Sequence, residues 1–225
     1  MSRRALVLGA GLAALASHSL PGAANLVTRR ATFGPALAGL GDRRGVALTF
    51  DDGPDPSSTP AFLEALDRLG WKATFFMLGA MAEAAPGLAS EVAAAGHEIA
   101  LHGHLHRCHL LRGPRAVLED VERGRDAVGQ ATGAVPAWHR PPYGAPSIGT
   151  VLAARRLGLR VVLWSTWGRD WRAQATPESV TEDLLARLEP GATLLLHDSD
   201  CTSSPGAWRS ALGSLEILAG RLAAD

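Results

Sequence analysis

Two adjacent carboxylates, Asp51 and Asp52, follow the mostly apolar run Val46–Phe50, and Gly53-Pro54 comes directly after them. Neighbouring like charges repel, so a metal ion would explain the pair. One carboxylate could bind the ion while the other stays free as a base. The alternative is an aspartate pair in a solvated turn between a strand and a helix, where Asp and Gly are common.

A second group of chemically active side chains lies in the histidine-rich stretch 101–109. In a strand, His102, His104 and His106 would share a face, whereas in a turn His104 would point away from the other two. Gly103 interrupts a strand, so we favour the turn. His102, His106 and one aspartate then form a set that leaves metal positions open for water and substrate. Zn²⁺ is the first candidate, Co²⁺, Mn²⁺ or Ni²⁺ would fit the same ligands, and a histidine-rich surface loop is the alternative.

Strands and helices, which must position these groups, are expected to alternate from residue 45 onward. Continuous apolar strands separated by helices predict a parallel sheet covered on both faces. We expect strands at 46–50, 73–78, 97–101, 135–139, 160–164 and 193–197. We expect helices at 60–69, through 91–95, and at 114–131, 147–157, 176–188 and 208–222.

The polar residues that follow the strands decide between an open sheet and a barrel. In an open sheet the strand ends would spread along an edge at about 4.8 Å per strand, whereas in a barrel they converge on one mouth. We therefore predict a distorted TIM-like (β/α) barrel with fewer than eight full units. The polar residues at the strand ends, which would meet at its mouth, are Asp51, Asp52, His102, His104, His106, Arg140, Asp170, His197 and Asp198.

Length and charge bound the function. The chain has 225 residues, enough for one large domain or two small ones, and its 22 basic and 22 acidic residues leave a formal net charge of zero. Nothing therefore indicates a nucleic-acid partner. Six tryptophans accompany one tyrosine, and those at 138, 164, 167 and 171 could be core or could form apolar walls on which sugar rings stack.

The N-terminus has the three-part form of a signal peptide: Arg3-Arg4, the apolar run Ala5–Ala16, and small residues up to Asn25. The run is short for a membrane span of about 20 residues, and a helix packed on the domain is the alternative. We expect a signal peptide or membrane anchor at 1–24, a linker at 25–44 and the catalytic domain at 45–225. The protein would then be exported or membrane-anchored, and cytoplasmic if this segment is not a signal.

Five motifs in this order resemble those of the polysaccharide deacetylase family (carbohydrate esterase family four, the NodB-homology domain): TFDDGPD, GHEIALHGHLH, RPPYG, WGRDW and LLLHD. The resemblance covers about residues 45–222 and is highly specific. It implies a metal-dependent hydrolase that removes N-acetyl groups from an N-acetylglucosamine-containing polysaccharide of the cell wall or of chitin type. We also expect a monomer. The alternatives are an O-acetyl esterase acting on a xylan-type glycan, a cyclic-amide hydrolase, and a non-catalytic carbohydrate-binding domain.

The resemblance also implies roles for individual residues. Asp51 matches the catalytic base, and Asp52 matches the metal ligand that His102 and His106 complete. Arg140 matches the arginine that holds the base, although a structural salt bridge would look the same in sequence.

The later motifs supply the other roles. His197 matches the general acid, and Asp170 and Trp171 match the motif that supports the arginine and the histidine and lines the pocket. Leu195 matches the apolar residue beside the acetyl methyl group. Tyr143 matches the position whose backbone N–H helps to bind the oxyanion.

Three positions depart from the family pattern. Gly103 replaces a hydroxyl residue that steadies the histidine loop, which puts the order of that loop in doubt. Arg107 replaces a proline, and Trp167 replaces an aspartate and adds an apolar wall to the substrate groove.

The chain has two cysteines, Cys108 and Cys201. They follow His106 and His197 closely, so both are expected on loops at the same mouth. A disulfide between them is our hypothesis for an exported protein, and two unrelated thiols are the alternative.

Overall fold

The structure, a computed structural model, describes residues 13–22, 37–41 and 45–223. Within these residues the main feature is a seven-stranded parallel sheet with the order β5-β4-β3-β2-β1-β7-β6. The strands are β1 (Ala47–Asp51), β2 (Thr74–Met77), β3 (Glu98–Leu101), β4 (Trp138–His139), β5 (Arg160–Val161), β6 (Thr166–Trp167) and β7 (Thr193–His197).

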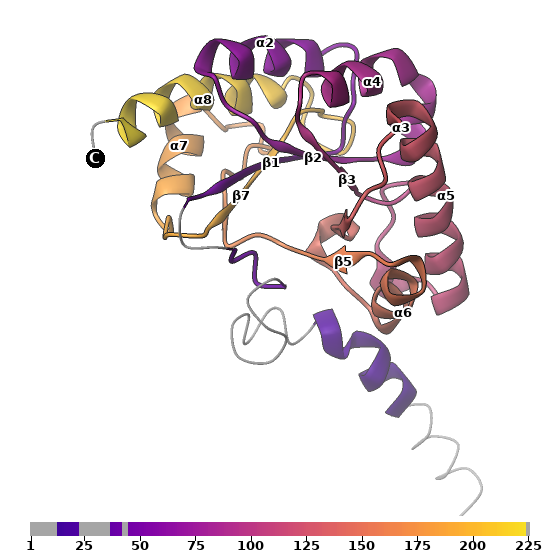
Figure 1. The fold of residues 1–225 in the computed structure, drawn as a ribbon. Coiled ribbons are helices and arrows are strands. Elements are labelled where there is room, and N and C mark those ends of the chain that lie inside the picture. Colours follow the sequence, from indigo (N-terminus) through magenta and orange to yellow (C-terminus); the bar gives the residue numbers. More distant parts are fainter. Residues whose placement is uncertain (1–12, 23–36, 42–44, 224–225) are drawn as a thin grey trace, which may run out of the picture.

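The helices lie around the outside of the curled sheet (Figure 1). They are α2 (Thr59–Leu69), α3 (Gly79–Ala84), α4 (Pro86–Ala94), α5 (Pro114–Thr132), α6 (Ile148–Leu157), α7 (Pro177–Leu185) and α8 (Trp208–Leu222), with short turns η1 (His109–Leu111) and η2 (Pro142–Gly144). This half-barrel confirms the predicted distorted TIM-like fold. Helix α2 shows why the sequence pattern predicted the helices. It has Pro60 in its first turn, and Gly70 caps its C-terminal end with a left-handed φ of 65°.

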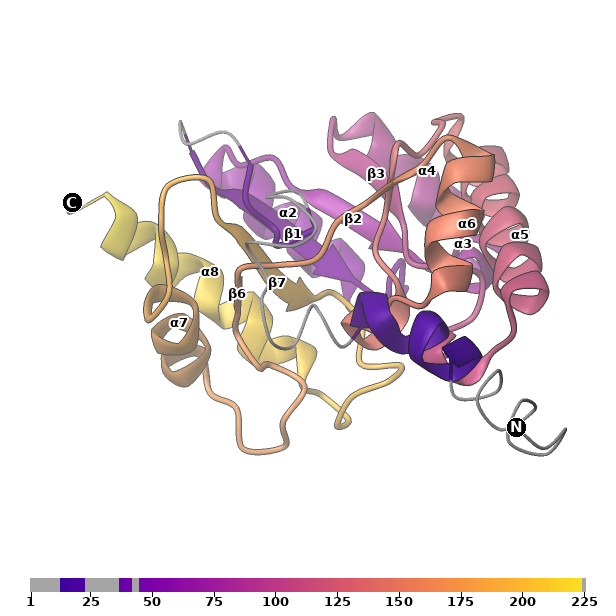
Figure 2. The same cartoon turned by 90° about the horizontal axis from the view of Figure 1, so that it is seen from below.

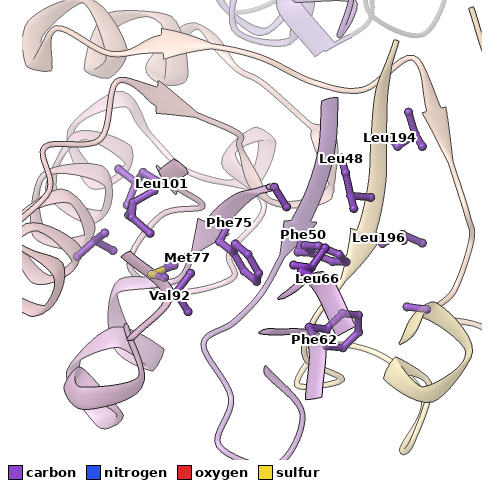
Figure 3. Packing of buried hydrophobic residues seen from close by; sticks show 14 of the residues in the cluster. Leu48, Phe50, Phe62, Leu66, Phe75, Met77, Val92, Leu101, Leu194 and Leu196 are labelled. Carbon is purple, nitrogen blue, oxygen red and sulfur yellow. The ribbon is translucent and has the colours of Figure 1, made fainter. Parts of the chain in front are cut away.

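Alternate residues of the central strands face two different environments. Phe50 of β1 packs outward against Phe62 of α2 and Phe75 of β2, with ring centroids 5.0 and 5.1 Å apart (Figure 3). Leu194 and Leu196 of β7 belong to the same outer core. The residues between them face the interior of the half-barrel, where they can reach the mouth.

Two predicted strands differ from the structure. The predicted strand 135–139 is limited to β4 at 138–139, because Val135 is exposed. The predicted strand 160–164 is wrong in its length and its partners. β5 ends at Val161, and the chain then crosses to the other edge of the sheet to form β6. Val162 N donates to His139 O (3.1 Å) and Ser165 N donates to Thr193 O (3.1 Å). Between them Leu163 and Trp164 pack inside the barrel. An apolar run cannot distinguish a buried strand from a buried crossing, because both remove the same side chains from water.

The N-terminal region contributes two short described pieces. A helix at 13–22 lies beside α6 (Figures 1 and 2), and His18 Nε2 lies 3.1 Å from Leu110 O. Residues 37–41, inside the predicted linker, run along the sheet: Gly41 N donates to Gly191 O (2.8 Å), and Ala38 is buried. In the described ranges no helix has both the length and the apolar character needed to cross a membrane. Most of the predicted leader and linker lies outside the described residues.

Candidate active site

The aspartate pair stands where β1 ends. Asp51 is the last residue of β1 and pairs in register with His197 of β7. Asp52 adopts a φ of 84°, a left-handed conformation that is costly for a residue with a side chain. Both carboxylates are buried and face His102, whose Nε2 lies 3.7 Å from Asp51 Oδ2 and 3.5 Å from Asp52 Oδ1. Strain held at this point is typical of a functional site.

The histidine stretch forms the predicted turn. β3 ends at Leu101, and His102 and His106 then approach the same oxygen, each with its Nε2 atom 3.5 Å from Asp52 Oδ1. His104 points away, toward Glu83, with 3.9 Å between His104 Nε2 and Glu83 Oε2. His102 Nδ1 lies 2.8 Å from Arg140 O. A carbonyl only accepts, so Nδ1 carries the hydrogen and Nε2 keeps a lone pair.

A carboxylate of α5 holds this turn. Asp120 Oδ2 accepts from His104 N (3.0 Å) and Oδ1 accepts from Leu105 N (3.4 Å). Gly103 has a φ of 98°, and a Cβ there would lie 3.0 Å from Asp120 Oδ2. The missing hydroxyl residue is therefore replaced by a glycine that fits the turn and an aspartate that binds its backbone.

The three groups that converge here fit a divalent cation. Within the described chain no hydrogen-bond donor contacts the buried Oδ1 of Asp52. Burial lowers the pKa of His102 well below its usual value and also lowers the pKa of His106, so both rings are neutral. Three lone-pair groups whose ligand atoms all lie within 4.8 Å of one another are favourable only around a positive charge.

Arg140 engages the other aspartate. Its Nη1 donates to Asp51 Oδ1 (2.6 Å) and to Thr49 Oγ1 (2.9 Å), and its Nη2 donates to Leu163 O (3.1 Å). The guanidinium also lies over the Phe76 ring, 3.9 Å from the centroid. Burial raises the pKa of Asp51 to about 6, against the lowering effect of the Arg140 charge. Asp51 is thus a carboxylate of unusual basicity that is held in one orientation.

His197 forms a second charge pair across the mouth. Its Nδ1 lies 3.0 Å from Asp170 Oδ1, and its backbone N donates to Asp170 Oδ2 (2.7 Å). Burial lowers the pKa of His197, but the Asp170 carboxylate, together with the aspartate pair, outweighs this and raises it to about 10. A cation at Asp52 would cancel part of that increase. The imidazole is a proton donor at neutral pH.

A cavity of about 310 Å³ opens between these groups. Tryptophans form one wall: Trp167 lies 5.7 Å from Trp164 and 5.1 Å from Trp171 between ring centroids, and Trp171 meets His197 edge-on at 5.8 Å. Leu195 lines the floor. On the opposite side the Tyr143 ring lies 4.4 Å from that of His106, and its backbone takes a φ of 62°.

The predicted site residues other than the cysteines all lie at this mouth. Cys108 and Cys201 are free thiols, so the hypothesised disulfide is not formed in the structure; Cys201 Sγ lies instead 3.9 Å from Asp52 O.

Sequence reasoning missed three residues of the site: Thr49, Asp120 and Thr202. Asp198 was expected at the end of the sixth strand, but its partners were not. Asp198 accepts from Gly53 N (3.1 Å) and from Thr59 Oγ1 (2.6 Å). A signal existed only for Asp120, which is an acid on the same helical face as the apolar Val117 and Val121.

Known proteins resemble this chain in sequence and in fold. A profile of the polysaccharide deacetylase family matches residues 39–162. A peptidoglycan-N-acetylglucosamine deacetylase of Listeria monocytogenes is 36% identical over 159 residues, which cover 71% of this chain and 33% of that protein. The chain thus spans about a third of the length of that relative. A chitooligosaccharide deacetylase of Bradyrhizobium sp. is 37% identical over 172 residues, or 74% of this chain and 75% of that protein.

Solved structures agree with the sequence comparison. The family 4 carbohydrate esterase from Streptomyces lividans in complex with acetate has a TM-score of 0.71 and 29% identity, over 80% of this chain and 88% of that one.

Proposed function

Because this chain belongs to the polysaccharide deacetylase family, we propose that it removes N-acetyl groups from an N-acetylglucosamine-containing polysaccharide of the peptidoglycan or chitin type. One observation carries the proposal. The fully buried Oδ1 of Asp52 faces His102 and His106, beside a buried carboxylate base and a protonated imidazole. Hydrolysis of an amide needs those three elements together.

Asp52, His102 and His106 would hold a divalent cation, with Zn²⁺ as the first choice and Co²⁺, Mn²⁺ or Ni²⁺ as alternatives. When bound, such an ion lowers the pKa of water to about 7 and draws charge from a carbonyl oxygen. The second nitrogen of His102 donates to the Arg140 carbonyl, which fixes the ring with its lone pair toward the site.

Asp51 is the general base of the proposed reaction. Arg140 occupies its Oδ1, so Oδ2, the oxygen that faces His102, is the one left to take a proton from the attacking water. Without a cation the pKa of Asp51 is about 6, so the group is ionised at neutral pH, and a cation at Asp52 would keep it ionised until it accepts the proton.

His197 is the general acid. Asp170 holds its Nδ1, so its Nε2 delivers the proton to the sugar nitrogen as the amide bond breaks. The tryptophan wall would stack on the sugar ring, and Leu195 would contact the acetyl methyl group. Tyr143 would supply its backbone N–H to the oxyanion, a contact typically worth about 2.7–4 kcal/mol of barrier.

The same geometry could cleave an O-acetyl ester of a xylan-type glycan. The names of the sequence relatives, which specify N-acetylglucosamine and chitooligosaccharide, favour the amide. A non-catalytic carbohydrate-binding domain would need the tryptophans but neither of the two buried charge pairs.

We further propose that the protein works outside the cytoplasm as a monomer. The basic start and apolar run of residues 1–24 support export or membrane attachment. N-terminal sequencing of the protein from the culture medium and the membrane fraction tests this, because recovery of the full N-terminus from the cytosol alone would contradict it.

Acetate release tests the activity. We expect release from N-acetylglucosamine oligomers or peptidoglycan, little release from acetylated xylan, loss after chelation, and recovery when Zn²⁺ is returned. No release from any of these substrates by protein with metal bound would favour the binding domain. Release from xylan alone would favour the esterase.

A further inference from the structure

The two oxygens of Asp52 have different partners. Oδ2 accepts a hydrogen bond of 2.6 Å from Thr202 Oγ1. Oδ1 has no donor in the described part of the chain and lies 3.5 Å from both His102 Nε2 and His106 Nε2. The threonine therefore takes the oxygen on the side away from the histidines.

Thr202 is carried by a segment that is bound to the loop after Asp52. This segment, residues 198–207, connects β7 to α8. Ser199 Oγ donates to Asp55 Oδ2 (2.9 Å), and Ser58 Oγ donates to Asp198 O (2.5 Å). Asp198 also receives the backbone N–H of Gly53 (3.1 Å). These contacts hold the threonine in place relative to the carboxylate.

The solvent exposure of the two residues differs sharply. Asp52 is 0% exposed, whereas Thr202 is among the exposed residues. Thr202 thus lies between the carboxylate and water with its hydroxyl directed inward. Among the described residues, the Thr202 hydroxyl is the only side-chain group that donates a hydrogen bond to Asp52.

We propose that Thr202 is a positioning residue that keeps Asp52 a one-oxygen ligand, and this inference rests on the metal-dependent function proposed above. A carboxylate can bind a metal through one oxygen or through both. With Oδ2 engaged by Thr202, only Oδ1 is free to join the two imidazole nitrogens. The remaining coordination positions stay open for water and for the substrate carbonyl.

Three variants separate this role from simple shielding. Thr202→Val keeps the shape but removes the donor, so Oδ2 stays buried without a partner. Thr202→Ala also removes the donor but makes room for a water that can replace it. Thr202→Ser keeps the donor with one methyl group less. The order of metal affinity expected for the positioning role is native and Ser highest, Ala next and Val lowest. Simple shielding predicts that Val is nearest to native.

The measurement is the Zn²⁺ dissociation constant of protein stripped by chelation, determined by competition with a fluorescent chelator. We expect Thr202→Val to weaken binding by about 10–100-fold, as is typical when a group behind a ligand is lost. Ser204→Ala is the matched control in the same loop, because Ser204 contacts Trp171 O through its backbone N (3.2 Å). Circular dichroism of each metal-free variant shows that it is folded.

Each outcome decides between the two proposals. Native protein that binds no Zn²⁺ would overturn the metal-dependent function itself. Native protein that binds Zn²⁺, with Thr202→Val at native affinity, would overturn the role of Thr202 and leave the function standing. Weak binding by Thr202→Val with native binding by Thr202→Ser supports the inference.

Discussion

Arg140 Nη1 lies 2.6 Å from Asp51 Oδ1, and neither side chain is more than 3% exposed. A buried ion pair gains from Coulomb attraction but loses the hydration of both charges, so its net contribution to stability is small. The ion pair instead orients the Asp51 carboxylate. Thr49, Leu163 and the Phe76 ring fix Arg140, and Arg140 in turn fixes the carboxylate.

Removing the arginine should destabilise the fold in a pH-dependent manner. Arg140→Met leaves the Asp51 charge buried and uncompensated, which typically costs about 3–5 kcal/mol of unfolding free energy. The folded pKa of Asp51 is already raised from 3.8 to about 6, and without Arg140 it rises further. Ionisation of Asp51 thus destabilises the fold as pH rises. The unfolding free energy lost in Arg140→Met should therefore be larger at pH 7 than at pH 5.

Urea unfolding of the metal-free proteins at the two pH values measures this difference. Arg155→Met, which alters an exposed arginine of α6, is the control and should unfold like the native protein. Equal destabilisation at both pH values would contradict a role for the Asp51 charge.

Substitution of the two adjacent aspartates should affect different properties, activity for Asp51 and metal affinity for Asp52. Asp51→Asn removes the base but no ligand, so acetate release should be abolished while the Zn²⁺ affinity stays close to native. Asp52→Asn removes the ligand, so the Zn²⁺ affinity itself should fall. Metal competition and acetate assays on the same preparations measure both effects. Equal loss of metal in the two variants would show that their roles are assigned wrongly.

The Asp170–His197 pair should set the alkaline limit of activity. Against the effect of burial, Asp170 and the aspartate pair raise the pKa of His197 to about 10 without a cation, so the acid is protonated at neutral pH. A cation at Asp52 would lower this pKa, so the activity of the metal-loaded enzyme should fall on the alkaline side, below pH 10. Asp170→Asn removes the largest of the charges that raise the pKa of His197, so the alkaline limb of the kcat/KM profile should move to lower pH. Asp183→Asn, which alters the partner of Arg172, is the control. An alkaline limb that stays in place in Asp170→Asn would exclude His197 as the acid.

Asp120 should control the order of the histidine turn. Asp120→Ala leaves the backbone N–H groups of His104 and Leu105 without their acceptor, so His102 and His106 on either side lose their fixed spacing. We expect Zn²⁺ to bind about 10–100-fold more weakly, as for other groups behind metal ligands. Asp120→Asn, which keeps one acceptor oxygen, should be intermediate. Glu119→Ala, next to it but exposed and paired with Arg115, should bind as native does; native affinity in Asp120→Ala would refute the role.

Trp167 should affect substrate binding and not the metal. It lies between Trp164 and Trp171 in the cavity wall, so Trp167→Ala removes the centre of the stacking surface. KM for N-acetylglucosamine oligomers should rise several-fold, with kcat and Zn²⁺ affinity little changed. Trp138→Ala, which alters a tryptophan paired with Arg160 outside this cavity, is the control. A change in kcat alone would place Trp167 elsewhere in the reaction.

Local sequence determined most strands and helices of this protein and the turn that carries its histidines. Apolar runs bounded by glycine and proline predicted most strands and helices, because periodicity and caps act within a few residues. The spacing of His102 and His106 around Gly103 predicted the turn and the pairing of the two rings for the same reason. Motif order indicated which strand ends carry chemistry.

Tertiary structure alone decided which distant groups meet. The run 160–164 divides between the two edges of the sheet, because only sheet order determines whether an apolar segment pairs or crosses. Thr202 reaches Asp52 across 150 positions, and Arg140 reaches Asp51 across 89. A polar residue in a loop has no local pattern that reveals its partner. The hydroxyl that donates to Asp52 could be found only once the parallel strands had brought their carboxyl ends together.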